Sequence, residues 1–157
     1  MNIVCFHNPD EENGYLSNWY HSDFLMDGIK YTSMEQFMMY KKAIYFQDAK
    51  RAEEILAISD VARIKELGRL VTGYNDSIWS GIRQIVVYEG LIAKFSQNDT
   101  LKKLLKGTGE AILAECAVKD LIWGIGLSMS DSRRMNMEEW RGLNLLGYTL
   151  MEVRNKL

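Results

Sequence analysis

Apolar residues recur at intervals of three and four positions through most of this chain, which is the spacing of helices that bury one face. The clearest stripe includes Met34, Phe37 and Ile44, and Thr32 or Ser33 stands where a helix N-cap is expected. This pattern predicts a helix from about residue 34 to residue 46. Comparable patterns predict further helices over residues 48–58, 60–71, 76–97, 101–105 and 143–155.

Three short segments carry β signals instead. Residues 3–6 and 112–117 read as short strands, and residues 24–31 place Asp27-Gly28 between alternating apolar positions, which predicts a hairpin with a tight primed turn. We therefore expect one domain over residues 1–157, a mainly α, helical bundle-like fold with a small N-terminal β-hairpin and strand appendage.

Two glycines interrupt the longest predicted helix, over residues 76–97. Each costs about 1 kcal/mol relative to alanine, so Gly81 and Gly90 predict close packing at those two points.

Composition and charge narrow the class of protein. The chain has 157 residues, is 47% hydrophobic and carries a net charge of −2, with Lys and Arg scattered along it. This distribution is not typical of a protein that grips a nucleic-acid backbone over many phosphates. If the protein meets a nucleic acid, we expect contact at a single nucleotide.

The sequence also bears on location and on metals. It has no apolar run of membrane-spanning length and no leader-like N-terminus, so we expect no membrane partner and a cytoplasmic location. Two cysteines, Cys5 and Cys116, fit a reducing compartment. Together with His7 and His21 they lack the short paired spacing of structural zinc sites, so we expect no metal and no cofactor.

Glu35 is the first candidate for chemistry, because it lies among aromatic and apolar residues where a carboxylate is costly to bury. Two interpretations are open. Thr32 and Glu35 have the spacing of a capping box, whereas Ser33 and Gln36 form an equally good box that would leave Glu35 available. Lys42 lies two turns further along the same helical face, where it would reach an anionic part of a ligand or be solvated.

Asp120 is the second candidate. It precedes Trp123-Gly124 and Gly126, which offer a ring for stacking and backbone amides for a phosphate or ribose. The alternative is a turn or capping aspartate. Nucleophilic catalysis and ATP chemistry are disfavoured, because the chain shows no Ser/His/Asp pattern, no Gly-rich phosphate loop and no activated cysteine.

These residues and others resemble the NADAR, or YbiA-like, family. The resemblance runs from about Phe6 to the C-terminus, and the order and spacing of the blocks form the signature. The blocks are Leu16-Ser17-Asn18 with Phe24, Asp27-Gly28, Ser33-Met34-Glu35-Gln36, Lys42, Leu67-Gly68-Arg69, Trp79, Lys94-Phe95, Leu104-Leu105, Glu115, Asp120, Trp123-Gly124 with Gly126, Asn144-Leu145-Leu146-Gly147, and Leu150-Met151-Glu152-Val153-Arg154.

The resemblance implies a mainly helical fold and an N-glycosidase that hydrolyses the bond between ribose C1 and a nitrogen. The implied substrate is a phosphoribosylamino-pyrimidine intermediate of riboflavin synthesis, with release of ribose 5-phosphate. The alternatives are ADP-ribose on guanine bases in nucleic acid and a non-catalytic ADP-ribose or nucleotide reader. Either hydrolysis passes through an oxocarbenium-like transition state that a carboxylate stabilises.

The resemblance also implies roles. Glu35 is the expected catalytic carboxylate, and Asp120 is expected to position ribose hydroxyls or water. The expected substrate-binding residues are Lys42, Arg69 and Lys94 for phosphate, Trp79 and Trp123 for base stacking, Ser17, Asn18 and Asn144 for hydrogen bonds, and Gly124 and Gly126 for backbone approach.

The sequence departs from the family pattern at three positions. Gln36 and Cys116 stand where the family often has histidine, and Ile125 stands where it often has aspartate. The segment 127–141 is longer than in compact members and carries Asp131, Arg133 and Arg134. It is expected to be a lid, a diphosphate clamp or a solvated loop.

Overall fold

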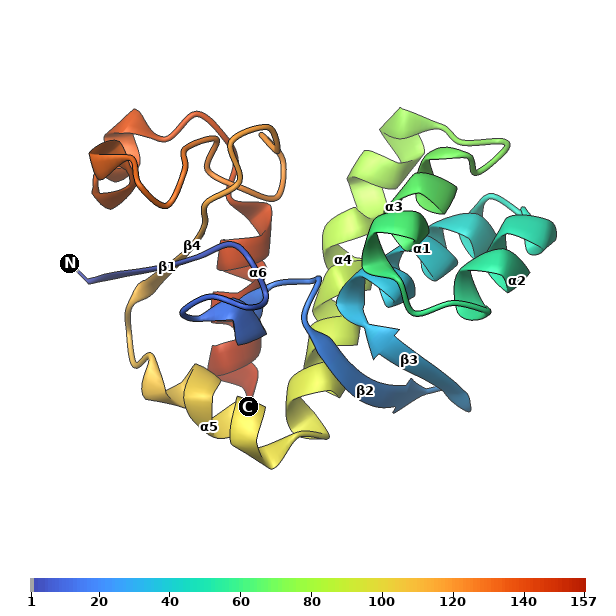
Figure 1. The fold of residues 1–157 in the computed structure, drawn as a ribbon, viewed down its shortest axis with the longest axis horizontal. Coiled ribbons are helices and arrows are strands. Elements are labelled where there is room, and N and C mark those ends of the chain that lie inside the picture. The colour runs from blue at the N-terminus through green and yellow to red at the C-terminus, as the bar shows by residue number, and fades with distance from the viewer. Residues whose placement is uncertain (1) are drawn as a thin grey trace. The chain divides into compact units, whose positions relative to one another are not determined.

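The computed structural model describes residues 2–157, which divide into two compact units (Figure 1). The central unit is His21–Gln97, and the terminal unit combines residues 2–20 with residues 98–157. Each unit has its own two-stranded sheet, with β2 and β3 in the central unit and β1 and β4 in the terminal unit.

The central unit begins with the predicted hairpin. Strands β2 (His21–Met26) and β3 (Ile29–Ser33) pair antiparallel. The turn between them has positive φ at both Asp27 (52°) and Gly28 (77°), as a primed two-residue turn requires. The hairpin prediction is confirmed.

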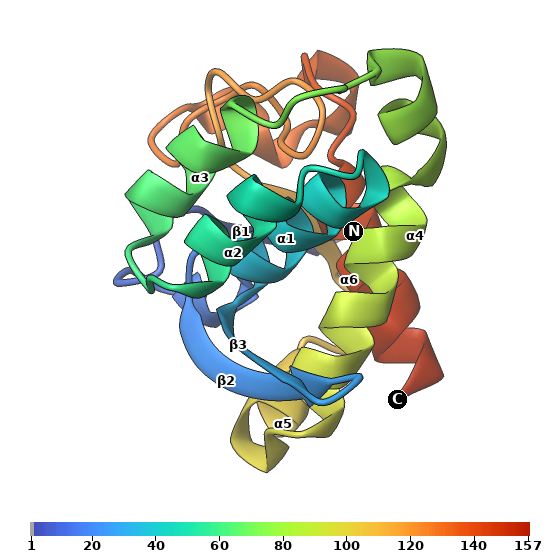
Figure 2. The same ribbon diagram turned by 90° about the vertical axis from the view of Figure 1, so that its right-hand side faces the viewer.

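Four helices complete the central unit: α1 (Met34–Tyr45), α2 (Ala49–Leu56), α3 (Val61–Arg69) and α4 (Asp76–Ser96). Helix α1 contacts all three others and β3 (Figure 2). The fully buried rings of Tyr31 and Phe37 meet edge to face, with centroids 5.0 Å apart. Because α1 is central, its first two turns are buried on nearly all sides, Glu35 and Gln36 included.

The two glycines of α4 have different surroundings. A Cβ at Gly90 would lie 2.6 Å from the Phe37 ring, whereas a Cβ at Gly81 would have no neighbour within 4 Å. Close packing is confirmed at Gly90, and the prediction was wrong for Gly81, which lies on the exposed side of the helix.

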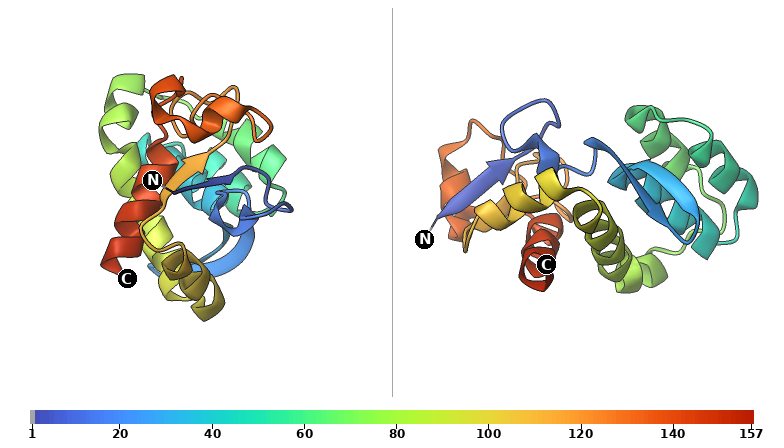
Figure 3. Two further views of the ribbon diagram at one scale, coloured as in Figure 1. Left: turned by 90° about the vertical axis from the view of Figure 1, so that its left-hand side faces the viewer. Right: turned by 90° about the horizontal axis from the view of Figure 1, so that it is seen from below.

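The terminal unit is built on a parallel strand pair (Figure 3). Strand β1 (Ile3–Phe6) pairs with β4 (Ile112–Glu115) in a register that places Phe6 opposite Glu115. Helix α6 (Leu145–Lys156) packs on β4, and α5 (Asp99–Gly107) leads into that strand. Three short 3₁₀ turns complete the unit, over Gly14–Leu16, Ser132–Met135 and Met137–Glu139.

The mainly helical composition is confirmed, as is each predicted helix and strand. The β residues near the N-terminus do not form one appendage, because β1 pairs with β4 rather than with the hairpin. The bundle-like arrangement and the single domain stay predictions. Within residues 2–157, no helix is both long and apolar enough to cross a membrane.

Candidate active site

The start of α1 decides between the two interpretations of Glu35. Ser33 is the N-cap, and its Oγ accepts a hydrogen bond from the Gln36 N–H at 3.1 Å. Gln36 Oε1 accepts from the Thr32 N–H at 2.8 Å, so the amide that a Thr32–Glu35 box would use is bonded to Gln36. The Ser33–Gln36 alternative is therefore the one that forms, with the Gln side chain reaching one residue further back than in the standard box.

The contacts of Gln36 give a structural reason for a glutamine at a position where the family often has histidine. Its Nε2 donates to the carbonyls of Ile55 (3.1 Å) and Ile58 (2.8 Å), at the end of α2. All of the polar capacity of this buried amide is thus directed at the scaffold, and Gln36 fastens α1 to α2.

Glu35, Lys42 and Arg69 share one electrostatic neighbourhood in the central unit. Glu35 is 5% exposed. Burial lowers the pKa of Lys42, the Glu35 charge raises it, and the Arg69 charge lowers it again, so the pKa of Lys42 ends below its ordinary value. The structure thus brings together a buried carboxylate and two cations on α1 and α3.

Lys42 is held in place by its contacts. Its Nζ donates to the Gly68 carbonyl at 2.8 Å and lies 4.5 Å from the centroid of the Tyr74 ring. These contacts fix the ammonium beside Arg69, which is exposed. Of the three ammonium protons, the Gly68 contact uses one.

Trp79 and Lys94, both on α4, are buried. Trp79 is 6% exposed and its ring centroid lies 6.4 Å from that of Phe46. Lys94 is fully buried, its Nζ lies 5.0 Å from the Phe95 ring centroid, and burial lowers its pKa to about 7. Near neutral pH such a lysine is only partly charged, which weakens it as a phosphate ligand. The phosphate and stacking roles of these two residues stay predictions.

In the terminal unit, Asp120 caps a turn, which is the alternative to a catalytic role that its sequence position also allows. Its Oδ1 accepts from the N–H groups of Ile122 (3.0 Å) and Trp123 (2.8 Å). Asp120 is nevertheless only partly buried. The turn engages one carboxylate oxygen, so a structural role and a chemical role for the other oxygen are compatible.

The two glycines after this turn have structural reasons of their own. A Cβ at Gly124 would lie 3.0 Å from the carbonyl oxygens of both Glu115 and Asp120, and Gly126 has a φ of 76°. These requirements explain the Gly-x-Gly pattern without a ligand. The partly exposed Trp123 lies between Asp120 and Gly124.

The three residues expected to hydrogen-bond the substrate differ in their contacts. Asn144, fully buried, accepts from Glu115 N at 3.0 Å and donates to the Leu113 carbonyl at 2.8 Å, which fastens the start of α6 to β4. Ser17 Oγ accepts from Trp19 N at 3.1 Å. The Asn18 side chain has a buried Oδ1 with no hydrogen-bond partner. Asn18 therefore fits a ligand-binding role best of the three.

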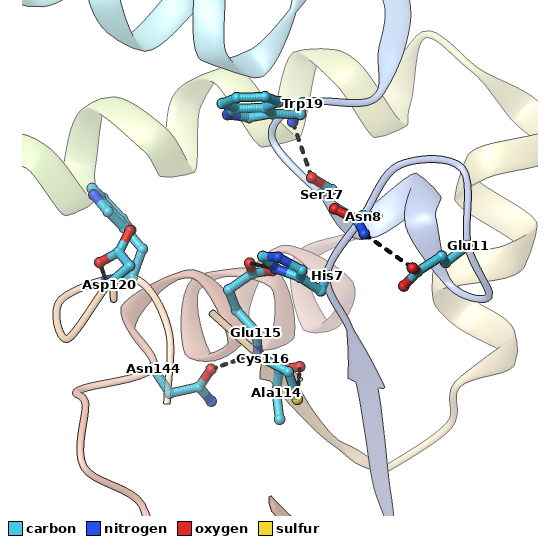
Figure 4. A network of polar contacts seen from close by, with 11 residues as sticks. His7, Asn8, Glu11, Ser17, Trp19, Ala114, Glu115, Cys116, Asp120 and Asn144 are labelled. Atoms are coloured by element: carbon cyan, nitrogen blue, oxygen red, sulfur yellow. Dashed lines mark hydrogen bonds and ion pairs between the residues drawn. The ribbon is translucent and has the colours of Figure 1, made fainter. Parts of the chain in front are cut away.

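Two residues outside the predicted set lie beside this loop (Figure 4). Glu115 ends β4, and its Oε1 lies 3.2 Å from Nδ1 of His7, the residue that follows β1. Burial raises the pKa of Glu115, His7 counteracts part of the rise, and Asp120 adds to it. Glu115 was visible in the family blocks, but only the parallel pairing of β1 with β4 reveals His7 as its partner.

In the segment 127–141, charged side chains bond to other residues of the same segment. Arg133 pairs with Asp131 through two contacts, of 3.0 and 2.7 Å, and Arg134 Nη1 donates to the Asp131 carbonyl at 3.0 Å. A lid or clamp role stays a prediction. Among residues 2–157, no three His, Cys, Asp or Glu side chains are grouped as a metal ion would require.

Comparison with known proteins identifies the class. The model of the NADAR domain family matches residues 5–157, so this chain belongs to the NADAR family.

Individual relatives agree with that assignment. The chain is 36% identical over 161 residues to an N-glycosidase of Acanthamoeba polyphaga mimivirus, with 98% of this chain and 95% of that protein covered. It is 31% identical to a riboflavin biosynthesis protein of Vibrio vulnificus, over 98% of this chain but 38% of that longer protein. The solution structure of Escherichia coli YbiA, whose sequence bears the name N-glycosidase YbiA, is similar with a TM-score of 0.81, at 29% identity over 99% of this chain and 84% of that one.

Proposed function

We propose that this protein is a hydrolase of N-glycosidic bonds that acts on a ribose phosphate substrate. The observation that carries the proposal is the burial of Glu35 in α1, whose cap is made by Ser33 and Gln36. Membership of the NADAR family and full-length similarity to two proteins named N-glycosidases support it. A buried carboxylate is the group that this reaction uses to stabilise positive charge on the sugar.

The roles of the two carboxylates follow from the chemistry. As the bond between ribose C1 and nitrogen breaks, the sugar becomes an oxocarbenium-like cation and the electron pair leaves with the base. Glu35 stabilises that cation and accepts a proton from the attacking water, whose oxygen bonds to C1, and the departing nitrogen takes up a proton, so that one water is consumed for each bond broken. Asp120 positions ribose hydroxyls or the water through the oxygen that its turn does not use. Lys42 and Arg69 are the strongest candidates for the phosphate, because Lys42 interacts electrostatically with both Glu35 and Arg69.

For the substrate, we propose a phosphoribosylamino-pyrimidine intermediate of riboflavin synthesis, which would yield ribose 5-phosphate. The name of the Vibrio vulnificus relative supports this choice. The second candidate is ADP-ribose on guanine, which presents the same ribose–nitrogen bond. A cytoplasmic location, expected from the sequence, is part of this proposal.

The experiment is an assay of sugar release. The purified protein is incubated with a phosphoribosylamino-uracil and, separately, with ADP-ribosylated guanosine, and the free sugar is quantified against a no-enzyme control that measures spontaneous breakdown. Release above the control from the first substrate supports the main proposal, and release from the second alone supports the alternative. Tight binding of either with no release identifies a reader and contradicts the enzymatic proposal.

A further inference from the structure

The carboxyl ends of β1 and β4 place a buried acid and a histidine side by side. Because the strands are parallel and Phe6 lies opposite Glu115, the next residue, His7, emerges beside the Glu115 side chain. Figure 4 shows the carboxyl group of Glu115 next to the His7 ring, with Asp120 on the neighbouring loop. His7 Nδ1 and Glu115 Oε1 are 3.2 Å apart.

The backbone holds Glu115 rigidly. Its N–H donates to Asn144 Oδ1 at 3.0 Å, and its carbonyl accepts from Ile125 N at 2.8 Å. The main chain is thus fixed by α6 on one side and by the glycine loop on the other. A side chain on such a support is preorganised rather than adaptable.

Only one of the two oxygens of the Glu115 carboxyl group has a hydrogen-bond partner. Glu115 is 9% exposed, and its Oε2 is buried without a hydrogen-bond partner. A buried polar atom without a partner destabilises the folded state, so stability alone gives no reason to keep a glutamate here. An apolar side chain would leave no such unpartnered atom.

A hydroxyl group is the ligand that matches this oxygen. Because a hydroxyl both donates and accepts, it can bond an ionised or a protonated carboxyl group, and the bond to the ionised form is the stronger. Asn18 Oδ1, in the same unit, is a second buried acceptor without a partner. A ribose substrate carries hydroxyl groups that can donate to such buried acceptors.

We infer that Glu115, oriented by His7, binds a ribose hydroxyl of the substrate and thereby makes the protein selective for ribosyl over deoxyribosyl compounds. This inference rests on the proposed function. Glu115 touches the substrate in this scheme, and His7 is a positioning residue that acts through Glu115.

The test compares kcat/KM for a ribosyl substrate with kcat/KM for its 2-deoxy and 3-deoxy analogues. For wild-type protein we expect a preference for ribose. In Glu115→Ala the preference should fall roughly tenfold or more for one analogue, as expected for loss of a hydrogen bond to a charged group. The differing intrinsic lability of deoxy sugars cancels when the ratios of two variants are compared. Glu152→Ala, at an exposed glutamate of the same unit, is the matched control and should leave the ratio unchanged.

Substitutions of His7 test the inference independently, because they leave the buried carboxyl group of Glu115 in place. His7→Leu should reduce the ribose preference several-fold, and His7→Asn, which keeps an N–H donor, should restore part of it. An unchanged ratio in folded Glu115→Ala overturns the inference. If that variant does not fold, an unchanged ratio in His7→Leu overturns it instead.

Failure of the proposed function is distinguishable from failure of this inference. If wild-type protein releases no sugar, the comparison moves to binding of ribose 5-phosphate and 2-deoxyribose 5-phosphate by calorimetry. A ribose preference that Glu115→Ala abolishes would support the hydroxyl site without hydrolysis. Equal binding of both sugars by wild-type protein would overturn it.

Discussion

Gln36 Oε1 accepts the backbone N–H of Thr32 at 2.8 Å, and this contact takes the amide that Glu35 would have bonded in a capping box. The negative side chain beside Gln36 is therefore not explained by the cap, although it is buried. This relationship is the reason to test Glu35 first.

Glu35→Gln should leave the fold intact, because the change is nearly isosteric and the Ser33–Gln36 cap is unaffected. Turnover should fall on the order of a hundredfold or more, since the amide cannot stabilise the sugar cation or accept a proton from water. The measurement is kcat for sugar release, with thermal melting as the check on folding. Glu53→Gln, on the exposed side of α2, is the control and should retain full activity. Near wild-type turnover of Glu35→Gln would remove Glu35 from the mechanism.

Two substitutions of Asp120 separate its hydrogen bonds in the turn from its negative charge. Asp120→Asn keeps an Oδ1 acceptor for the Ile122 and Trp123 amides, so it should fold normally and lose roughly tenfold in kcat/KM. Asp120→Ala loses the turn as well and should also be destabilised by about 1 kcal/mol, as for a lost cap. Full activity of a folded Asp120→Asn would leave Asp120 with its structural role alone.

The double variant of Glu35→Gln with Asp120→Asn tests whether the two carboxylates act in one reaction step. Residues that act as a unit show combined losses well below the product of the single losses. We expect such non-additivity in kcat/KM. Losses that multiply fully would indicate independent roles.

His7 should titrate above its ordinary pKa of 6.5, because its hydrogen bond to Glu115 and the Glu115 charge favour the protonated ring, with a smaller contribution from Glu11. A group whose pKa is raised in the folded state stabilises the protein below its unfolded pKa. That stabilisation disappears as pH rises through the folded pKa. The pKa of Glu115 is also raised, so the pair as a whole favours the fold less as pH increases.

Proton NMR of the His7 ring measures this directly. In Glu115→Gln the pKa of His7 should fall, because the charge that holds the proton is gone, whereas Glu152→Gln should leave it unchanged. A wild-type pKa of His7 at or below 6.5 would contradict the pairing.

The two glycines of α4 should respond to alanine in opposite directions. Gly90→Ala places a methyl group against the buried Phe37 ring and should destabilise the protein by about 1–3 kcal/mol. Gly81→Ala meets open space on an exposed helical position and should stabilise it by up to about 1 kcal/mol. Urea unfolding of both variants is the measurement. Equal effects at the two sites would show that packing against Phe37 does not distinguish them.

Local sequence patterns determined most of the secondary structure of this protein. Helix spacing, N-cap residues and the Asp27-Gly28 turn depend on neighbours a few positions away, so helices α1 to α6 and the hairpin could be predicted. The apolar and aromatic surroundings of Glu35 and the glycine-bearing segment after Asp120 likewise identified both carboxylates as candidates, because residue type and spacing are visible without coordinates.

Tertiary structure decided what distant residues do to one another. The partner of β1 lies in the last third of the chain, and no pattern within four residues encodes it, so the His7–Glu115 pair was not foreseen. The same holds for Gly81, which looks like Gly90 in sequence but faces open space. Helix and turn preferences are local energies, whereas the pairing of β1 with β4, burial and pKa shifts arise only when segments far apart in sequence pack together.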